Sequence, residues 1–433
     1  MSGLAQILMH RGEQVTGSDR QDSEDIERLR AAGAEVVIGH AAENIQSPDL
    51  VVYTAAISRD NPELLAARKK NIPTIVRADF LGELMRDFTC PIGISGTHGK
   101  TTTTGMLGCV FNESGLDPTI MIGGNLPQIG GNIQIGSDAV LVFEACEYVD
   151  SFLSFNPKMA VITNIEADHL DYFDSISEIR DSFVKFLQKL PDDGTAIVNK
   201  DNKNAVIVSN KTDCRKIYYS VQNPSADYYA SDIHYNEGKP TFSICSDGET
   251  LANITLNVRG EHNVSNALAA FAVASEFGMN HDAIAKGLET FTGTGRRFES
   301  HGEVRGIRLF DDYAHHPTEI KTTFASAEAL ERTGKIWYVF QPHTYSRTKA
   351  LKEEFIEVLY GRENVIIADI YAARENPIKD ITSQNLARDC GATYIDGDLG
   401  DIADFLAENA KSGDIIVTLG AGDVHKIIGF LKE

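Results

Sequence analysis

The sequence predicts an α/β protein of three domains built on parallel sheets, and three observations lead to that class. The chain has 433 residues, more than a single hydrophobic core usually serves. Short apolar runs alternate with helix-like segments along most of its length, an order typical of parallel sheets. A glycine-rich loop lies between one of these apolar runs and the helix that follows, near residue 96.

The composition excludes several kinds of protein and partner. The formal net charge is −22, so nucleic acid is not an expected partner, because phosphate contacts need clustered Lys and Arg. No run of roughly 18 apolar residues is present, and we expect no membrane insertion. The 6 cysteines form no C-x-x-C pair, which is typical of reduced thiols. We expect a cytoplasmic protein, and the sequence does not indicate its oligomeric state.

The first domain is expected over residues 1–87, as one small parallel sheet. Residues 3–10 predict an amphipathic helix, and residues 14–19 predict a strand that ends in an acidic residue. A helix leading to such a strand forms the second half of a βαβ nucleotide-binding unit, whose first strand and glycine loop are missing here. The alternation continues with helices expected at 25–32 and 62–70, and strands expected at 35–38, 50–53 and 74–76.

The second domain, residues 88–295, opens with the glycine-rich loop. Glycines let backbone N–H groups surround phosphate oxygens, Lys100 supplies a positive charge, and the hydroxyl of Thr101 can hold Mg²⁺. A strict P-loop would need glycine at position 94, where the chain has Ile94. The alternative is a plain glycine turn before a helix, expected at 100–112. The predicted phosphate-binding residues are Gly96, Thr97, His98, Gly99, Lys100, Thr101 and Thr102.

Two continuous apolar runs, 139–143 and 159–163, predict strands buried on both faces of a parallel sheet. Glu144 follows the first run, and Asn164 and His169 follow the second. Because ligands bind beyond the carboxyl ends of such strands, we expect Glu144 and His169 to converge on the loop from neighbouring strands. Glu144 either ligates Mg²⁺ or ends its strand.

His169 alone would be a weak signal, since a lone histidine is more often structural and imidazole is an unusual Mg²⁺ ligand. Its acidic and amide neighbours favour a site here, and they are Asn164, Glu166, Asp168 and Asp171.

Further along, the domain is expected to carry a β-rich stretch over 212–258, with 254–258 the clearest strand, and helices over 180–190, 267–277 and 282–290. Asn263 and Asn266 either cap the helix that follows or contact a nucleotide base. The glycines of 292–297 predict a hinge, at which Arg297 either forms a surface ion pair or reaches the transferring phosphate.

The third domain, residues 296–433, repeats the alternation with strands expected at 307–310, 335–340, 365–370 and 415–419. One loop holds Asp312, His315 and His316, and the next holds His343 and Arg347. Adjacent histidines beside carboxylates would suit zinc, yet no cysteine and no H-E-x-x-H pattern supports a zinc site.

Taken together, these motifs resemble the Mur ligases, ATP-dependent amide-forming enzymes of peptidoglycan precursor synthesis. The run 96–102 is similar to their ATP loop, and the resemblance covers essentially the whole chain. It implies Rossmann-like N- and C-terminal domains around a P-loop-like central ATPase domain. The runs 312–319 and 341–343, with Tyr345 and Arg347, resemble the members that join L-alanine to UDP-N-acetylmuramate.

The resemblance also implies roles for the residues already singled out. ATP and Mg²⁺ would be the cofactors, and the metal ligands would be Thr101, Glu144 and His169. The nucleotide contacts completed by the third domain would be Asn263, Asn266, Arg297 and Asp312. The catalytic set, which includes the residues around the incoming amino acid, would be Lys100, Asn164, His169, His316, His343 and Arg347.

Two departures and three alternatives accompany this interpretation. The first strand and glycine loop that receive the UDP portion are missing, and Thr344 stands where the family frequently has arginine. One alternative is the related ligase that recycles a tripeptide onto the same nucleotide sugar. A P-loop ATPase or kinase, and a nucleotide-binding protein without activity, are the other two.

Overall fold

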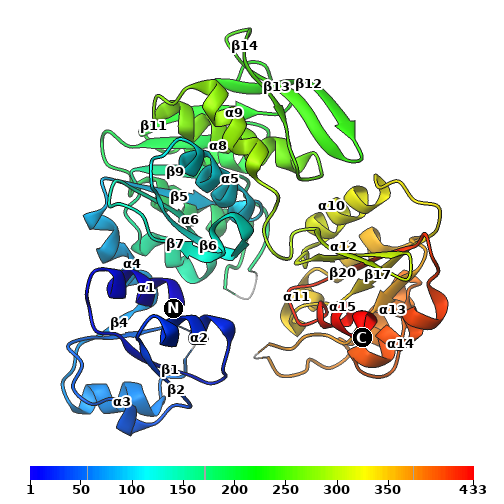
Figure 1. Cartoon of the computed structure of the whole chain (residues 1–433), viewed down its shortest axis with the longest axis horizontal. Coiled ribbons are helices and arrows are strands. Elements are labelled where there is room, and N and C mark those ends of the chain that lie inside the picture. The colour runs from blue at the N-terminus through cyan, green and yellow to red at the C-terminus, as the bar shows by residue number, and fades with distance from the viewer. Residues whose placement is uncertain (56, 170–171, 374) are drawn as a thin grey trace.

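The chain is described by a computed structural model over residues 1–55, 57–169, 172–373 and 375–433. It forms three α/β domains, with the N-terminal domain at the lower left of Figure 1, the central domain above it and the C-terminal domain at the right. The predicted fold class is therefore confirmed. The exact domain limits at residues 87 and 295 stay predictions.

The N-terminal domain holds two separate two-stranded parallel sheets, β1–β2 and β3–β4. The prediction of one sheet was wrong, because no described strand pairs with both β1 and β3 and each strand is only three or four residues long. The predicted helices and strands themselves are present, with ends shifted by at most two residues. They are α1 (Ser2–His10), β1 (Thr16–Asp19), α2 (Glu24–Ala31), β2 (Glu35–Ile38), β3 (Val51–Tyr53), α3 (Pro62–Lys69) and β4 (Thr74–Val76). A further helix, α4 (Arg77–Leu84), was not predicted.

The central domain is organised on one ten-stranded sheet in the order β14-β13-β12-β11-β10-β9-β5-β8-β6-β7. The strands from β6 to β12 in this order run parallel, and β7, β13 and β14 pair antiparallel at the edges. Its strands are β5 (Cys90–Ser95), β6 (Thr119–Leu126), β7 (Gly131–Gln134), β8 (Val140–Glu144), β9 (Met159–Ile162), β10 (Thr195–Asn199), β11 (Arg215–Ser220), β12 (Tyr228–Asn236), β13 (Lys239–Ser246) and β14 (Glu249–Thr255).

Two expectations about this sheet were wrong. β8 and β9 are not neighbours, because β5 lies between them and pairs with both. Glu144 and the residues after β9 therefore flank the phosphate loop from opposite sides. The clearest predicted strand, 254–258, ends at Thr255. The Leu256 N–H still donates to the Pro240 carbonyl of β13, and the chain then continues toward α8.

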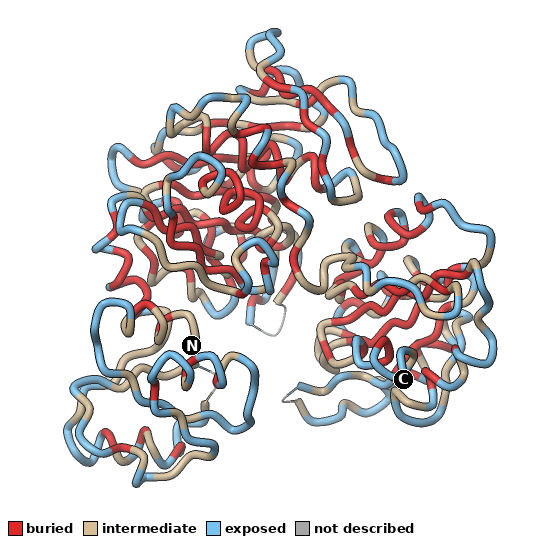
Figure 2. Tube along the Cα trace, in the orientation of Figure 1, coloured by how far each residue is buried: buried red, intermediate tan, exposed pale blue. Residues whose placement is uncertain are grey.

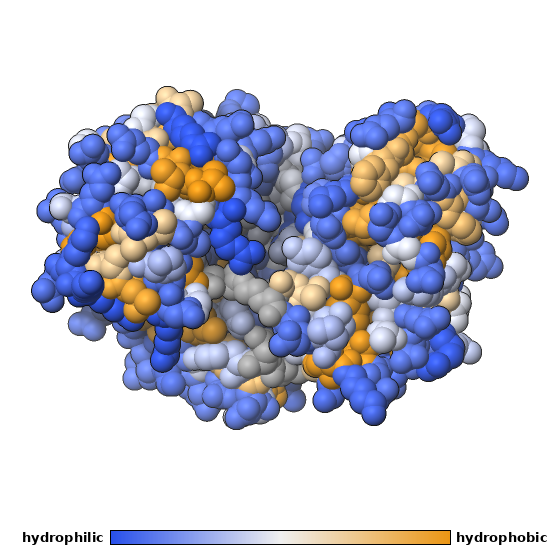
Figure 3. Space-filling model, turned by 90° about the horizontal axis from the view of Figure 1, so that it is seen from below, coloured by the Kyte–Doolittle hydropathy of each residue, from blue (hydrophilic) through white to orange (hydrophobic). Residues whose placement is uncertain are grey.

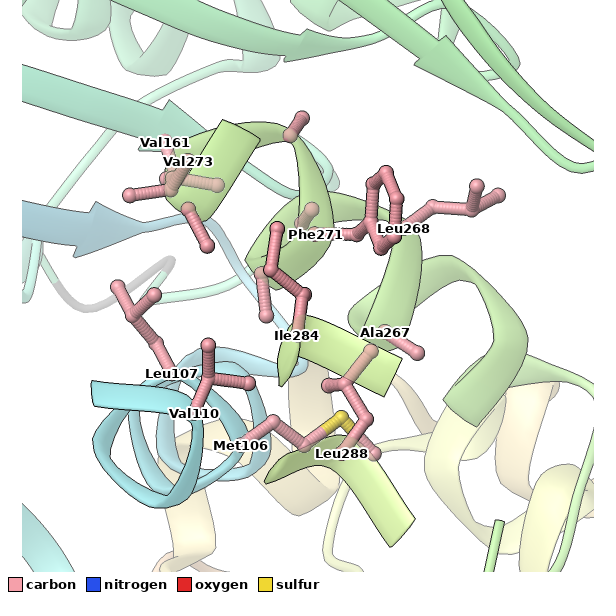
Figure 4. Close-up of a cluster of buried hydrophobic side chains, with 14 of the residues drawn as sticks. Met106, Leu107, Val110, Val161, Ala267, Leu268, Phe271, Val273, Ile284 and Leu288 are labelled. Atoms are coloured by element: carbon pink, nitrogen blue, oxygen red, sulfur yellow. The ribbon is translucent and has the colours of Figure 1, made fainter. Parts of the chain in front are cut away.

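The helices of the central domain are α5 (Lys100–Glu113), α6 (Ile176–Leu187), α7 (Lys203–Ser209), α8 (His262–Glu276) and α9 (His281–Thr290). α5 packs against both α8 and α9 through buried apolar side chains such as Met106, Phe271 and Leu288 (Figure 4). Two helices begin well before their predicted starts. α6 begins four residues early, where Ser175 caps it, and α8 already begins at His262.

The C-terminal domain carries a six-stranded sheet in the order β15-β16-β20-β17-β18-β19, parallel except for β15. Separate apolar cores pack on it, one around Phe324 and Phe355 and another around Leu406 and Ile427. Its elements are β15 (Glu299–Val304), β16 (Ile307–Asp312), α10 (Pro317–Glu328), β17 (Ile336–Phe340), α11 (Tyr345–Ala350), α12 (Lys352–Leu359), β18 (Val365–Ile367), α13 (Ser383–Cys390), β19 (Thr393–Tyr394), α14 (Leu399–Asn409), β20 (Ile415–Leu419) and α15 (Lys426–Lys432).

The surface seen from below is mostly hydrophilic, with apolar side chains in small separate patches and a hollow between two lobes (Figure 3). Among the residues that the structure describes, no helix is both long and apolar enough to cross a membrane.

Candidate active site

The phosphate loop, residues 96–99, joins β5 to α5 and depends on its two glycines. Gly96 has φ +137°, and a Cβ there would lie 2.1 Å from Thr163 Oγ1. Gly99 has φ +83°, and a Cβ there would lie 2.5 Å from Asn266 Oδ1. Both positions combine a left-handed backbone with a close neighbour, so any other residue would displace the loop. The loop thus opens directly onto the N-terminus of α5, where helix N–H groups favour an anion.

Asn164, predicted as catalytic, holds the phosphate loop in shape. Its Oδ1 accepts a hydrogen bond from the His98 N–H at 2.8 Å, and its Nδ2 donates to the His98 carbonyl at 3.1 Å. The Thr97 N–H also donates to the Asn164 carbonyl at 3.0 Å. In this arrangement the side chain acts on the loop rather than on a free reacting atom.

Lys100 is the first residue of α5, and its ammonium group turns back into the loop. It donates to the carbonyls of Gly96 and Thr97, and it lies 3.2 Å from Glu147 Oε2. Burial opposes its charge, but Glu147, together with Cys146 and Glu144, outweighs burial and raises the pKa of Lys100 above its ordinary value. Sequence reasoning did not single out Glu147, although it lies in the same polar run as Glu144.

Thr101 and Glu144 bring a hydroxyl oxygen and a carboxylate oxygen together beside the phosphate loop. Thr101 Oγ1 donates to Glu144 Oε2 at 3.0 Å, and Glu144 Oε1 accepts from the Gly123 N–H at 2.5 Å. A hydroxyl and a carboxylate in contact suit the oxygen preference of Mg²⁺. Glu144 was thus rightly expected beside Thr101.

The described side-chain contacts of His169 are with Asp168 and Tyr148. Its Nε2 is 3.8 Å from Asp168 Oδ2, its ring packs on Tyr148 at 4.6 Å between centroids, and its φ is +54°. No described contact joins it to Thr101 or Glu144, so its predicted place in the metal site stays a prediction. Asp171, expected in the same cluster, lies outside the described residues.

A cavity of about 610 Å³ lies at the phosphate loop, and residues of both the central and the C-terminal domain line it. Among its lining residues are the predicted nucleotide contacts His98, Gly99, Thr101, Thr102, Asn263, Asn266, Arg297 and Asp312. The cavity therefore brings together residues that lie more than 200 positions apart in the chain. Its size is that of a small-molecule site.

Asn263 and Asn266 were weighed as helix caps, and they do not cap α8. They lie in its first two turns, where Asn266 Nδ2 donates to Asn263 Oδ1 at 3.0 Å. Thr103 Oγ1 donates to Asn266 Oδ1 at 3.3 Å, which ties α8 to α5. Both side chains are buried, and both reach the cavity.

Arg297 and Asp312 bring the C-terminal domain to the cavity. The Arg297 guanidinium lies over the Tyr313 ring at 5.3 Å and 3.7 Å from Glu319 Oε1. Asp312 accepts from the Ala314 N–H and from Thr323 Oγ1, while burial raises its pKa to about 6. Arg297 was expected either to form an ion pair or to reach the transferring phosphate. It pairs with Glu319 and also lines the cavity.

The predicted amino-acid residues lie at a second contact between the two domains. Arg347 donates to Asp168 Oδ1 at 3.2 Å and is 3.2 Å from His343 Nδ1. His316 Nε2 lies 3.3 Å from the Ala167 carbonyl. Burial lowers the pKa of His343 to about 4 and also lowers the pKa of His316. Both imidazoles are therefore neutral near pH 7.

Ligand atoms of His98, Glu166 and His316 lie within 4.8 Å of one another, a spacing that a metal ion could occupy. The hydrogen bonds argue against that use. His316 Nδ1 accepts from the Thr318 N–H, so its Nε2 carries the proton that faces Ala167. His98 is flanked by two carboxylates that favour its proton. These residues fit a hydrogen-bonded cluster better than a metal site.

A phosphate loop that faces a second α/β domain across a cavity defines a class of proteins that bind nucleotide phosphates between domains. Family models match almost the whole chain: "Mur ligase family, catalytic domain" at residues 1–89, "Mur ligase middle domain" at 94–274 and "Mur ligase, glutamate ligase domain" at 296–422. The chain belongs to the Mur ligase family and is therefore an ATP-dependent ligase.

Ligases of two kinds, alanine-adding and peptide-adding, are among the proteins to which the chain is similar. The chain is 47% identical to the UDP-N-acetylmuramate--L-alanine ligase of Acetivibrio thermocellus, over 100% of this chain and 93% of the relative. The solved UDP-N-acetylmuramate-alanine ligase of Thermotoga maritima has a TM-score of 0.84 and 26% identity, covering 100% and 96%. The murein peptide ligase of Psychrobacter arcticus has a TM-score of 0.77 and 26% identity, with the same coverage.

Proposed function

We propose that this chain joins L-alanine to UDP-N-acetylmuramate with ATP, through an acyl phosphate, in peptidoglycan precursor synthesis. The observation that carries the proposal is the cavity shared by the phosphate loop and the C-terminal domain. Relatives of 45–48% identity that are named UDP-N-acetylmuramate--L-alanine ligase support the choice of substrates.

The phosphate loop and Lys100 would bind the ATP phosphates. The backbone N–H groups at the start of α5 favour anions, and Lys100 is already charged and turned into the loop. The Lys100 ammonium group lies 3.2 Å from Glu147 Oε2, so a carboxylate holds this charge at the loop. Asn164 keeps the loop open by fixing both polar groups of the His98 backbone.

Thr101 and Glu144 would hold Mg²⁺, because their oxygens already meet at 3.0 Å. The ion, when bound, neutralises charge on the β- and γ-phosphates. His169 is the proposed third ligand, on the strength of the family resemblance alone.

The reaction needs two anions to meet, since the muramate carboxylate attacks the γ-phosphorus and releases ADP. Lys100 and Arg297 supply positive charge at the loop and at the cavity wall. The amine of alanine then attacks the acyl carbon, and inorganic phosphate leaves. His316, His343 and Arg347 would surround this amine, and the proton that the amine releases can leave with the phosphate. Closure of the C-terminal domain would keep water from the acyl phosphate.

The tripeptide-recycling ligase is the nearest alternative. The loop at 341–347, with Gln341, His343 and Arg347, favours alanine as the incoming amine. Thr344, in place of the frequent arginine, has φ +65° and caps α11 by accepting from the Arg347 N–H. It therefore shapes the loop that presents Arg347. The TM-score is higher for the Thermotoga alanine ligase, 0.84, than for the murein peptide ligase, 0.77, which agrees with this choice.

We place the enzyme in the cytoplasm, where ATP and nucleotide sugars are made. The cysteines Cys90, Cys109, Cys146, Cys214, Cys245 and Cys390 are free, as a reducing compartment requires.

The test is release of phosphate and formation of UDP-N-acetylmuramoyl-alanine from Mg-ATP, with each substrate omitted in turn. The proposal expects phosphate release that depends on both UDP-N-acetylmuramate and L-alanine. Release without either acceptor would indicate an ATPase, and turnover with the tripeptide but not with L-alanine would indicate the recycling ligase.

A further inference from the structure

Glu319, which the sequence did not single out, lies where three parts of the site meet. It is the third residue of α10, and its Oε2 accepts hydrogen bonds from the N–H groups of His315 at 3.0 Å and His316 at 3.3 Å. With the His316 side chain this forms a capping box. A helix cap needs no more than this one oxygen.

The other carboxylate oxygen, Oε1, faces away from α10. It lies 3.1 Å from Nδ1 of His98, in the phosphate loop of the central domain. It also lies 3.7 Å from the guanidinium of Arg297, in the segment that connects the two domains. Glu319 is 14% exposed, so both contacts are largely shielded from solvent. One side chain therefore joins the phosphate loop, the connecting segment and the C-terminal domain.

The charges around His98 come from several elements. Glu319 on α10 and Glu166 after β9 lie beside its two ring nitrogens, while His316 packs on its ring at 5.0 Å between centroids. His262 on α8 also lies within electrostatic range. Burial opposes the charged ring, but Glu319 and then Glu166 outweigh burial and raise the pKa of His98 to about 9. His98 is thus cationic at pH 7 to 8.

A second contact beside Glu319 also joins α10 to the central domain. Thr318 Oγ1 donates to Glu166 Oε2 at 3.0 Å, so the start of α10 is bonded to the segment after β9. This bond and the contact between Glu319 and His98 hold α10 against the phosphate loop, at the cavity that both domains line.

We propose that Glu319 is a positioning residue for phosphoryl transfer, which fixes His98 and Arg297 at the cavity and ties the C-terminal domain to the phosphate loop. The inference rests on the proposed ligase function and adds a residue to it. Glu319 acts through His98 and Arg297, so it needs no contact with substrate. The charge of the Glu319 carboxylate, rather than its capping oxygen, fixes His98 and Arg297 at the cavity.

The substitution Glu319→Gln separates these two roles, because glutamine keeps an oxygen for the cap and loses the charge. Glu328→Gln is the matched control, since Glu328 lies on the same helix and pairs with Arg362 away from the cavity. Histidine ring signals in ligand-free protein labelled at histidine Cε1 would be titrated by NMR. The signal of His98 is identified by its loss in His98→Gln, among the 12 histidines.

In Glu319→Gln we expect the pKa of His98 to fall by about one unit or more, and kcat to fall about 10- to 100-fold with a smaller change in the KM for ATP. Glu328→Gln should change neither. Because the two residues act together, adding His98→Gln to Glu319→Gln should cost less than the two separate losses combined.

An unchanged His98 titration in Glu319→Gln, or a kcat equal to that of the control, would overturn the inference. If Glu319→Gln does not fold, Glu319→Asp tests the same point, because the shorter side chain withdraws the carboxylate from His98 Nδ1 and should lower the His98 pKa. An unchanged His98 pKa in Glu319→Asp would then overturn the inference. A wild-type protein that forms no product would contradict the ligase proposal instead, while the His98 titration would still decide whether Glu319 sets that charge.

Discussion

The N-terminal and central domains are both α/β, yet they are built very differently. In the central domain nearly every residue of β5, β8, β9 and β10 is buried, whereas the strands β1 and β2 have no fully buried residue (Figure 2). The central sheet has ten strands, and each N-terminal sheet has two. An isolated pair of strands is marginally stable at best, so the N-terminal sheets must depend on what they pack against.

That support comes through two helices. Leu4 and Ile7 of α1 and Phe80 of α4 are buried in the same apolar cluster as Leu141 and Phe143 of the central sheet. The phosphate loop, in contrast, is built into the middle of the ten-stranded sheet. The proposed site for ATP is therefore on a deeply buried framework, and the N-terminal domain is attached to that framework by packing.

The largest expected effect is the loss of ligation activity when a residue of the phosphate loop is changed. Lys100→Ala removes the charge at the phosphate loop, and we expect ligation to fall about a thousandfold or more. Steady-state product formation measures it, with Lys69→Ala on the exposed face of α3 as the control. Activity within about threefold of wild type in Lys100→Ala would refute the assigned role.

The next effect concerns the core beneath the site. Phe271 on α8 is fully buried against α5 and α9, and Phe271→Ala should lower the free energy of unfolding by about 3–5 kcal/mol. Chemical denaturation followed by circular dichroism measures this loss. A loss below about 1 kcal/mol would show that this core does not carry the stability assigned to it.

A smaller and more local effect is expected where the two domains meet. Leu4 is 3% exposed, and Leu4→Ala should weaken the packing of α1 by about 2–3 kcal/mol. Hydrogen exchange should then speed up in β1 to β4 while β5 and α5 stay protected. Equal loss of protection in both domains would mean that they unfold as one unit.

The smallest effect is expected within the N-terminal sheet. Val37 of β2 is 45% exposed, so Val37→Ala should change the free energy of unfolding by less than about 0.5 kcal/mol. The same denaturation experiment checks this value. A loss as large as that of Leu4→Ala would show that the N-terminal sheets hold more of their own stability than their burial indicates.

Features that depend on neighbouring residues in the sequence could be predicted. The apolar run into β5, the glycines and the Lys-Thr pair are enough to indicate a phosphate loop, and Glu144 was expected beside Thr101. These features follow from strand and helix patterns and from the chemistry of a few side chains. The three-domain fold followed from the repeated alternation of strands and helices.

Features that depend on distant parts of the chain could not be predicted. The sequence does not state that β5 lies between β8 and β9, so the strands that precede Glu144 and His169 were expected to be neighbours. Glu147 and Glu319 look like ordinary surface or capping residues until the fold brings Lys100 and His98 to them. The start of α8 was missed because its first residues, His262 and Asn263, are polar, although Asn263 is buried.

The central claim is that the carboxylate of UDP-N-acetylmuramate is phosphorylated at the loop before alanine attacks. The most direct measurement uses substrate labelled with ¹⁸O in that carboxylate, followed by mass spectrometry of the inorganic phosphate. An acyl phosphate requires the bridging oxygen to leave with phosphorus, so the account predicts one ¹⁸O atom in each phosphate formed. Phosphate without ¹⁸O, from a reaction that still forms the amide, would contradict the acyl phosphate.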